Sequence, residues 1–239
     1  LGSLSFPLAA QEPGTLVTLA GGGEQEGEGI PATDLALSLP LGVSVDKDGN
    51  VYIADTFNHR IRRVDITSGR VITVAGTGES GFSGDNGPAT EALLSAPQSV
   101  TVDASGNMYI ADSGNRRIRR VDFVTGTVTT IAGSGEFGFE GDGDPATAAL
   151  FGEIIALVVD DKGNLYISDG IDAQGRGNNR VRKIDLATGI ITTVAGKGDF
   201  NFSGDGGPAT EAGMTVEGIA IDSDGSIYIA DFNNYRIRR

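Results

Sequence analysis

A glycine-rich, acidic phrase recurs along the chain and carries the residue types of a metal or phosphate site. It reads GFSGDNGPATEA at residues 81–92, NFSGDGGPATEA at 201–212 and, in a more divergent copy, GFEGDGDPATAA at 138–149. The acids Asp85, Asp142 and Asp205 hold one place in the three copies and offer the oxygen ligands that calcium prefers. A phosphate cradle fits less well, because no lysine follows the glycines as it does in a P-loop.

The same phrase also fits a structural connector. Pro208 can begin a short helix that runs into ATEA, and acids such as Glu211 stabilise the first turn of a helix. Three phenylalanines recur just before the acids and are expected to pack the connector onto a neighbouring strand; they are Phe82, Phe139 and Phe202. We favour the connector, keep calcium as the alternative, and expect no other cofactor.

Residues for other kinds of catalysis are scarce. The chain has no cysteine, which excludes disulfides, thiolate metal sites and cysteine nucleophiles. Its one histidine is His59, and no G-x-S-x-G nucleophile motif occurs. These features favour a protein that is not an enzyme.

The basic residues are concentrated in four short segments. Three of them stand in each segment, which accounts for twelve of the 18 basic residues in the chain. Each segment follows an aspartate that ends the preceding apolar run, and repeated placement of this kind predicts ion pairs within or between repeats. The residues expected in these structural ion pairs are Asp55 with Arg60, Asp112 with Arg117, Asp169 with Arg180, and Asp231 with Arg236.

The elements that position these residues form an internal repeat. VYIAD at 51–55 returns as MYIAD at 108–112, LYISD at 165–169 and IYIAD at 227–231, so the tyrosines are 57, 57 and 62 residues apart. Each unit contains four short runs rich in β-branched or aromatic residues, such as 99–103, 107–112, 117–122 and 127–133 in the second unit. Short turns join the runs, whereas a long link that contains the acidic phrase joins the units. This pattern predicts the four-stranded antiparallel blades of a β-propeller.

The third run of each unit resembles the NHL repeat, which is named for its Asn-His-Leu signature. The matching residues are Asn58-His59-Arg60-Ile61, Asn115-Arg116-Arg117-Ile118, Asn179-Arg180-Val181 and Asn234-Tyr235-Arg236-Ile237. The third copy is read as one residue shorter. The resemblance covers nearly all of residues 15–239 and implies an all-β propeller fold, while one fold serves many functions.

Four blades are visible, and the sequence suggests how the ring closes. The last unit stops at YRIRR, after its third run, and the N-terminal TLVTLAG at 15–21 matches the fourth-run text RVITVAG at 70–76. We therefore expect the N-terminal strand to pair with the last blade and close the ring. The alternative is that the chain forms part of a six-bladed ring, as the resemblance implies. Residues 1–14 are expected to be an arm or the remnant of a leader, and residues 15–239 the propeller domain.

The turn after the second strand and the long link should lie on the same face of the propeller, because strand direction alternates within a blade. Loops on a rigid scaffold carry binding sites, so this loop face is the predicted binding face. Its candidate binding residues are Phe57, Asn58, His59, Arg116, Asp172, Gln174, Arg176, Asn178 and Tyr235.

The formal net charge of −14 limits the kinds of partner that the chain can bind. An acidic chain disfavours binding to nucleic acid and to anionic membranes, and no apolar run is long enough for membrane insertion. We therefore expect a non-catalytic binding or scaffold module that presents its loop face to a protein or glycan partner. The expected location is extracellular, periplasmic or in the cell envelope, and the oligomeric state is left open. The alternatives are a metal-dependent hydrolase or lyase with its site in the central channel, and an architectural subunit of a larger assembly.

Overall fold

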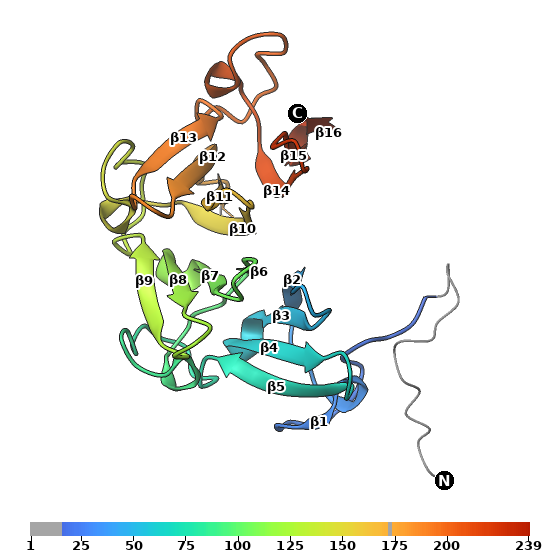
Figure 1. Ribbon diagram of the computed structural model, residues 1–239. Coiled ribbons are helices and arrows are strands. Elements are labelled where there is room, and N and C mark those ends of the chain that lie inside the picture. Colours follow the sequence, from blue (N-terminus) through green and yellow to red (C-terminus); the bar gives the residue numbers. More distant parts are fainter. Residues whose placement is uncertain (1–15, 172–173) are drawn as a thin grey trace.

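The computed structural model describes residues 16–171 and 174–239, and it is all-β with four propeller blades (Figure 1). The first blade contains β2 (Pro40–Val45), β3 (Val51–Asp55), β4 (Arg60–Asp65) and β5 (Arg70–Ala75), with the short β1 (Ile30–Pro31) added beside β5. The second contains β6 (Ser99–Val102), β7 (Met108–Asp112), β8 (Arg117–Val121) and β9 (Val128–Ala132). The third contains β10 (Glu153–Val159), β11 (Asn164–Ile171), β12 (Gly177–Asp185) and β13 (Ile191–Ala195). The fourth contains β14 (Val216–Ile221), β15 (Ile227–Asp231) and β16 (Arg236–Arg238).

The predicted blades are thus confirmed, and all strand pairs within them are antiparallel. Short hairpin turns set the register. In the first blade the Asp46 carboxylate accepts hydrogen bonds from the backbone N–H groups of Asp48 and Asn50, at 3.0 and 2.9 Å. The phenol of Tyr52 donates to the same carboxylate, which ties the turn to the second strand. Asp103, Asp160 and Asp222 make the equivalent contacts in the other blades.

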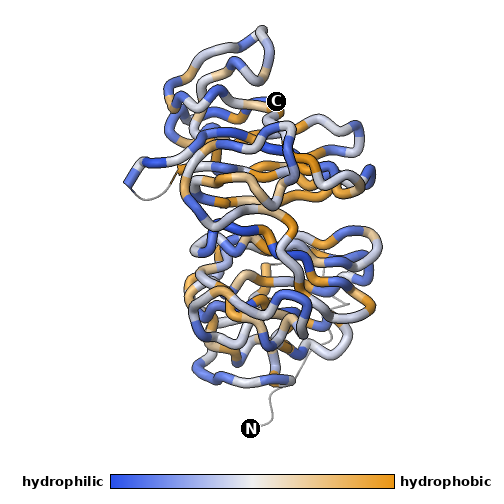
Figure 2. The backbone as a smooth tube through the Cα atoms, turned by 90° about the vertical axis from the view of Figure 1, so that its left-hand side faces the viewer, coloured by the Kyte–Doolittle hydropathy of each residue, from blue (hydrophilic) through white to orange (hydrophobic). Residues whose placement is uncertain are grey.

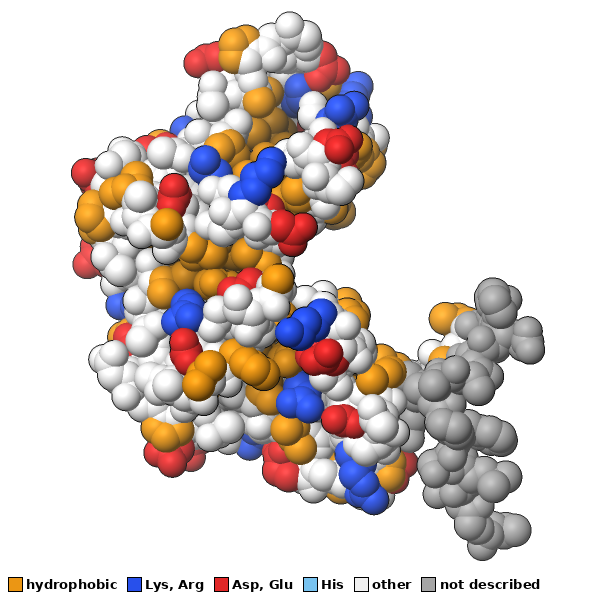
Figure 3. Space-filling model, in the orientation of Figure 1, with side chains coloured by type: hydrophobic (Ala, Val, Ile, Leu, Met, Phe, Trp, Pro, Cys, Tyr) orange, Lys and Arg blue, Asp and Glu red, His pale blue; other side chains and the backbone are white. Residues whose placement is uncertain are grey.

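The blades follow one another along an arc around a central hollow (Figures 1 and 3). Their hydrophobic cores lie between neighbouring blades rather than within one sheet. The core between the first two blades joins Tyr52 and Ile61 to Val100 and Ile110, together with Leu94 from the link between them. Figure 2 shows apolar residues along the strands and hydrophilic residues in the loops. Each blade therefore depends on the next for the burial of its apolar face.

The expected closure of the ring by the N-terminal strand is wrong for this structure. The sheet of the fourth blade ends at β16, and residues 16–20, which the structure describes, form no strand. Leu19 and Ala20 instead pack against the core of the first blade, and the N–H of Gly21 donates to the carbonyl of Ala32 at 2.9 Å. The arc leaves a gap between the first and fourth blades (Figure 3), so the segment cannot reach β16 while it keeps these contacts.

Acid pH should destabilise the fold through the turns between third and fourth strands. Backbone N–H groups of Ser68, Thr125 and Thr188 hydrogen-bond the side chains of Asp65, Asp122 and Asp185 and lower the pKa of each. A lowered pKa in the folded state stabilises it above the unfolded value of about 4, and this contribution is lost as the pH falls through the folded values. The thermal midpoint is therefore expected to drop below about pH 4. Replacing the three aspartates by asparagine should make that acid-side drop shallower in a thermal melt followed by circular dichroism.

Candidate partner-binding face

The connection between the second and third strands contains one residue with left-handed backbone geometry in every blade. In the first, second and fourth blades this residue ends a single 3-10 turn, such as Thr56–Asn58 or Ser113–Asn115. In the third blade it lies within the longer β12. His59, Arg116, Asn179 and Tyr235 hold this position, with φ between 48° and 55°. Residues with a side chain adopt this geometry at a cost of about 1–2 kcal/mol, so the surrounding contacts must hold the turn in place.

The third copy of the NHL-like motif is not shorter, which corrects the sequence alignment. Asn178, not Asn179, is the equivalent of Asn58 and Asn115, because its amide donates to Asp169 at 2.8 Å. Asn179 is the left-handed residue that follows, like His59 in the first copy. The motif therefore reads Asn-x-Arg-[Ile/Val] in all four blades. The six extra residues of the third unit lie between Asp169 and Asn178, before the motif, and they displaced the sequence alignment.

The asparagine of each motif joins the turn to the link that precedes its blade. The amide of Asn115 donates to the carboxylate of Asp112 at 2.8 Å and to the carbonyl of Gly81 at 2.7 Å. Asn58, Asn178 and Asn234 make the equivalent pairs of contacts. The turns and links therefore do share one face. Because their amides are engaged within the blade, Asn58 and Asn178 build this face rather than offer free donors to a partner.

The aspartates form ion pairs, but with a different arginine from the one expected. Asp112 pairs with Arg119 at 3.3 Å, and both side chains are fully buried. The same offset holds for Asp55 with Arg62, Asp169 with Arg182 and Asp231 with Arg238. The expected partners lie two residues earlier and bind carbonyl oxygens instead; these are Arg60, Arg117, Arg180 and Arg236. Both arginines of R-x-R share one side of the strand, so the register alone did not distinguish them.

Burial raises the pKa of two of these aspartates, Asp112 and Asp169, in spite of their donors. The carboxylate of Asp169 accepts hydrogen bonds from the N–H of Gly152 and the amide of Asn178, both at 2.8 Å. Even so, burial raises its pKa to about 7. Burial likewise raises the pKa of Asp112. A fully buried aspartate stands at this place in every blade, which assigns these carboxyl groups to the structure of the blade.

The acids considered for calcium contact the second arginine of R-x-R. Asp85 accepts from Arg119 at 2.9 Å, Asp142 from Arg182 at 2.8 Å and Asp205 from Arg238 at 2.6 Å. Glu28, in the divergent link before the first blade, holds Arg62 in the same way at 3.1 Å. The described part of the chain brings together no group of three or more His, Asp or Glu side chains that could hold a metal ion.

Phenylalanines complete the attachment of each link to its blade. The guanidinium carbons of Arg117 and Arg119 lie 3.9 and 5.0 Å from the centre of the Phe82 ring. Phe139 and Phe202 have the same two arginine neighbours in their blades, at 3.6 to 5.1 Å. The helical part of the link is one 3-10 turn at Ala89–Glu91 and its equivalents, and the proline stands just before it. The link thus braces the blade that follows it.

The remaining predicted binding residues have different surroundings. Phe57 and Tyr235 are exposed at the rim, the latter 96%. Nδ1 of His59 accepts the N–H of Ala96 at 3.0 Å, which ties the first blade to the next link. Gln174 is exposed and accepts from Arg176 at 3.4 Å. Asp172 lies outside the described residues.

Arg116 and Arg176 lie near the same aromatic ring, which belongs to a residue that the sequence analysis missed. Their guanidinium carbons lie 5.6 and 5.7 Å from the ring centre of Phe137, which comes from the link between the second and third blades. The ring is 45% exposed, and Nε of Arg116 is buried without a hydrogen-bond partner in the described part of the chain. The signal was available in the sequence: Phe137 directly precedes the phrase at 138–149, where the equivalent residue before the phrase at 81–92 is Ser80.

A cleft opens on the same face between the third and fourth blades. It measures about 480 Å³ and is lined by Gln98, Glu153, Glu217 and Phe232, among others. The amide of Gln98 donates to the carboxylate of Glu153. Burial raises the pKa of Glu217. Two carboxylates, those of Glu153 and Glu217, thus line the cleft.

Comparison with known proteins matches the repeat found in the sequence. The model of the NHL repeat matches residues 37–73 and 215–239. Teneurin-4 from Homo sapiens is 31% identical over 238 residues, which cover 89% of this chain and 8% of that protein. NHL repeat-containing protein 2 from Gallus gallus is 27% identical over 219 residues, which cover 84% of this chain and 30% of the relative. The chain thus spans less than a third of these curated relatives.

Solved structures share the fold. A structural genomics protein of unknown function from Bacteroides thetaiotaomicron superposes with a TM-score of 0.63 at 24% identity, over 83% of this chain and 46% of that one. A gluconolactonase from Xanthomonas campestris superposes with a TM-score of 0.57 at 13% identity, over 84% of this chain and 57% of that one. These likenesses concern the fold alone.

Proposed function

Because this chain belongs to the NHL-repeat β-propeller family, we propose that it is a protein-binding module whose loop face docks a partner with an acidic segment. The proposal keeps the secreted or cell-envelope setting suggested by the sequence, and the role is non-catalytic. Within residues 16–171 and 174–239, no helix is long and apolar enough to cross a bilayer.

The cluster of Arg116, Phe137 and Arg176 carries the proposal. Two guanidinium groups lie near one partly exposed ring, and the chain as a whole is strongly acidic. Arginine and aromatic side chains are the residues enriched at protein interfaces, and a guanidinium binds a carboxylate through paired hydrogen bonds. Exposed aromatic side chains extend the same rim, at Phe57, Phe200, Phe232 and Tyr235. The rest of the acidic surface would repel an acidic partner elsewhere and so direct it to this cluster.

Binding of a glutamate-rich peptide should depend on this cluster. We expect Arg116→Ala and Phe137→Ala each to raise the dissociation constant of the peptide by about tenfold or more, as loss of a hot-spot contact does. Isothermal titration or fluorescence anisotropy at low salt would measure it. Phe123→Ala is the matched control, because Phe123 is 64% exposed but lies in a turn between third and fourth strands, at the opposite end of the blade.

Other outcomes would contradict the proposal. The loop face would not be the site for an acidic peptide if Phe123→Ala reduced the peptide affinity as much as the two loop-face variants. The same conclusion would follow if the wild type did not bind the peptide. Binding of a sulfated oligosaccharide but not of the peptide would assign the face to a glycan. Turnover of a sugar lactone that is lost in Glu217→Gln would support the hydrolase alternative at the cleft.

A further inference from the structure

A cavity of about 370 Å³ lies between the first and second blades, beside the turn at 122–126. Small-molecule sites usually measure about 300–1,000 Å³ and have mostly apolar walls. The wall of this cavity comes from both blades and from the link between them, and its main apolar side chains are Tyr52, Val74, Pro88, Met108, Val121 and Phe123. The cavity shares no residue with the cluster of Arg116, Phe137 and Arg176, so it is a separate site.

Phe123 leaves this cavity open because its ring lies outside the core. The ring packs on the turn at Gly106, where a Cβ would stand 2.8 Å from the ring carbons, and it is 64% exposed. Leu186, the equivalent residue of the third blade, packs instead against the core between the second and third blades. A Cβ on Gly163, the equivalent of Gly106, would meet nothing within 4 Å. The space that Leu186 fills at one interface is therefore left open at the other.

Arg63 brings to the cavity a cation that uses few of its donors. A guanidinium has five N–H donors. In the described part of the chain the Arg63 side chain makes one hydrogen bond, to Asp65 at 3.4 Å, and its Nε is buried without a partner. Arg120, the equivalent residue of the second blade, donates to Asn107 at 2.8 Å and to Asp122 at 3.0 Å. Arg63 is therefore available to a ligand, whereas Arg120 is held by its own blade.

The other polar side chains that line the cavity are engaged within the protein, with the exception of Thr90. Asp122 accepts from the N–H of Thr125 at 3.0 Å and from its hydroxyl at 3.1 Å. The hydroxyls of Tyr52 and Thr73 are hydrogen-bonded as well. Thr90 is exposed, and its hydroxyl has no partner among the residues that the structure describes. One guanidinium and one hydroxyl are thus left for the polar end of a ligand.

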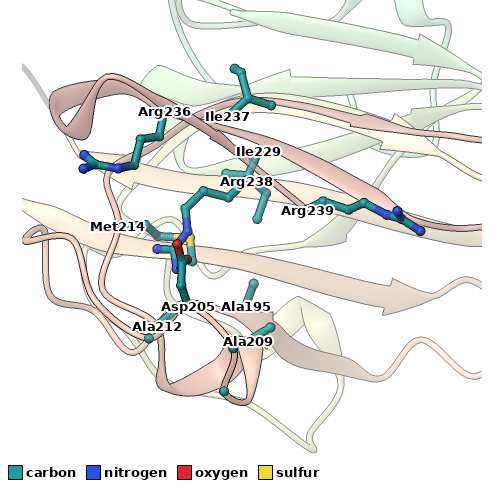
Figure 4. A pocket seen from close by; sticks show the side chains of 13 residues that line it. Ala195, Asp205, Ala209, Ala212, Met214, Ile229, Arg236, Ile237, Arg238 and Arg239 are labelled. Carbon is teal, nitrogen blue, oxygen red and sulfur yellow. The ribbon is translucent and has the colours of Figure 1, made fainter.

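A second cavity of about 370 Å³, in the fourth blade, differs because its guanidinium is already paired. Figure 4 shows Arg238 directed toward Asp205, and the two side chains lie 2.6 Å apart. The contact of Arg63 with Asp65, at 3.4 Å, is much longer. Of these two cavities, the one between the first and second blades therefore combines an apolar wall with an open cation.

We propose that this cavity binds a small carboxylate with an apolar body, such as one aromatic ring. The planar guanidinium of Arg63 binds the two carboxylate oxygens, and the hydroxyl of Thr90 donates to the same group. The apolar body lies among Tyr52, Met108 and Phe123, where its removal from water stabilises the complex. A single open cation suits one negative charge better than a phosphate group, which carries more charge and more acceptor oxygens.

Isothermal titration of the full chain with phenylpropanoate, and with phenylpropanol as its neutral match, tests the role of the cation. We expect the wild type to bind the acid about tenfold more tightly than the alcohol, because a hydrogen bond to a charged group is lost with the alcohol. Arg63→Met should bring the affinity for the acid down to that for the alcohol. Arg120→Met is the matched control and should keep the preference of the wild type.

A second pair of variants tests the cavity itself. Thr90→Trp places a large ring at an exposed position of the cavity wall and should weaken the binding of both compounds by about tenfold or more. Thr147→Trp, at the equivalent exposed position of the next link, should bind both like the wild type. Thermal melts followed by circular dichroism show that each variant is folded.

Four results would overturn the proposal. They are equal affinity of the wild type for the acid and the alcohol, unchanged binding by Thr90→Trp, and no binding of either compound at millimolar concentration. The fourth is tighter binding of phenyl phosphate than of phenylpropanoate, which would assign the cavity to a phosphorylated ligand instead.

Discussion

Arg119→Met is expected to lower the free energy of unfolding by about 3–5 kcal/mol, because it removes one partner of a buried ion pair. Arg119 is fully buried and binds Asp112, Asp85 and the carbonyl of Ser83, the last two at 2.9 Å. Its loss leaves the Asp112 carboxyl buried without its guanidinium and detaches the link from the second blade. Urea denaturation followed by circular dichroism would measure the change.

The neighbouring arginine is the matched control. Arg120 pairs with Asp122 at 3.0 Å, with both side chains about a third exposed. Such pairs contribute only about 0–1 kcal/mol, so Arg120→Met should change the midpoint little. The double variant Arg119→Met with Asp112→Asn should recover part of the loss, since it removes the uncompensated charge. If Arg119→Met and Arg120→Met lowered the free energy of unfolding by the same amount, the buried ion pair would not be what stabilises the blade.

Gly133→Ala is expected to lower the free energy of unfolding by several kcal/mol, on the order of 3 or more, whereas Gly126→Ala in the same blade should lower it by only about 1–2 kcal/mol. Both glycines have positive φ, +90° and +68°, which an alanine adopts only with strain. They differ in the space around them. A Cβ on Gly133 would stand 2.2 Å from the carbonyl oxygen of Arg116, whereas one on Gly126 meets nothing within 4 Å.

The comparison isolates the close approach of two backbones, because the conformational strain is common to both variants. Gly133 follows β9 and lies against the turn that carries Arg116, so the substitution should also move the loop face. We expect a lower thermal midpoint for Gly133→Ala and, in the titration with the glutamate-rich peptide, weaker binding. Equal midpoints for the two alanine variants would show that this contact can relax freely.

Sequence reasoning recovered the blades because their signals are local. The turn residues Asp46 and Gly49 with the alternation of VYIAD determine a hairpin, and four copies in register determine the repeat. It did not recover which arginine of R-x-R reaches the aspartate. That choice depends on Phe82, which fills the space between Arg117 and Arg119 from a link about 35 residues away in the chain.

The curvature of the arc was likewise not predictable. The match between residues 15–21 and β5 was correct as an assignment of strand type, since Gly21 repeats the geometry of Gly76. Its expected partner was wrong, because the angle between successive blades depends on how side chains such as Ile110 and Tyr109 interdigitate. On the loop face, Phe137 was missed because it directly precedes a phrase assigned to architecture as a whole.

The bracing of each blade by the link before it defines how such a chain can grow by gene duplication. Arg119 finds Asp85 and Phe82 upstream of its own blade, and Arg182 finds Asp142 and Phe139 in the same way. A duplicated segment that starts at a link and ends after a fourth strand therefore carries its own brace with it. A segment cut at the first strand would arrive with a buried guanidinium that keeps the aspartate of its own blade but lacks the acid and the aromatic ring of the link. The heritable module is thus the link together with the blade that follows.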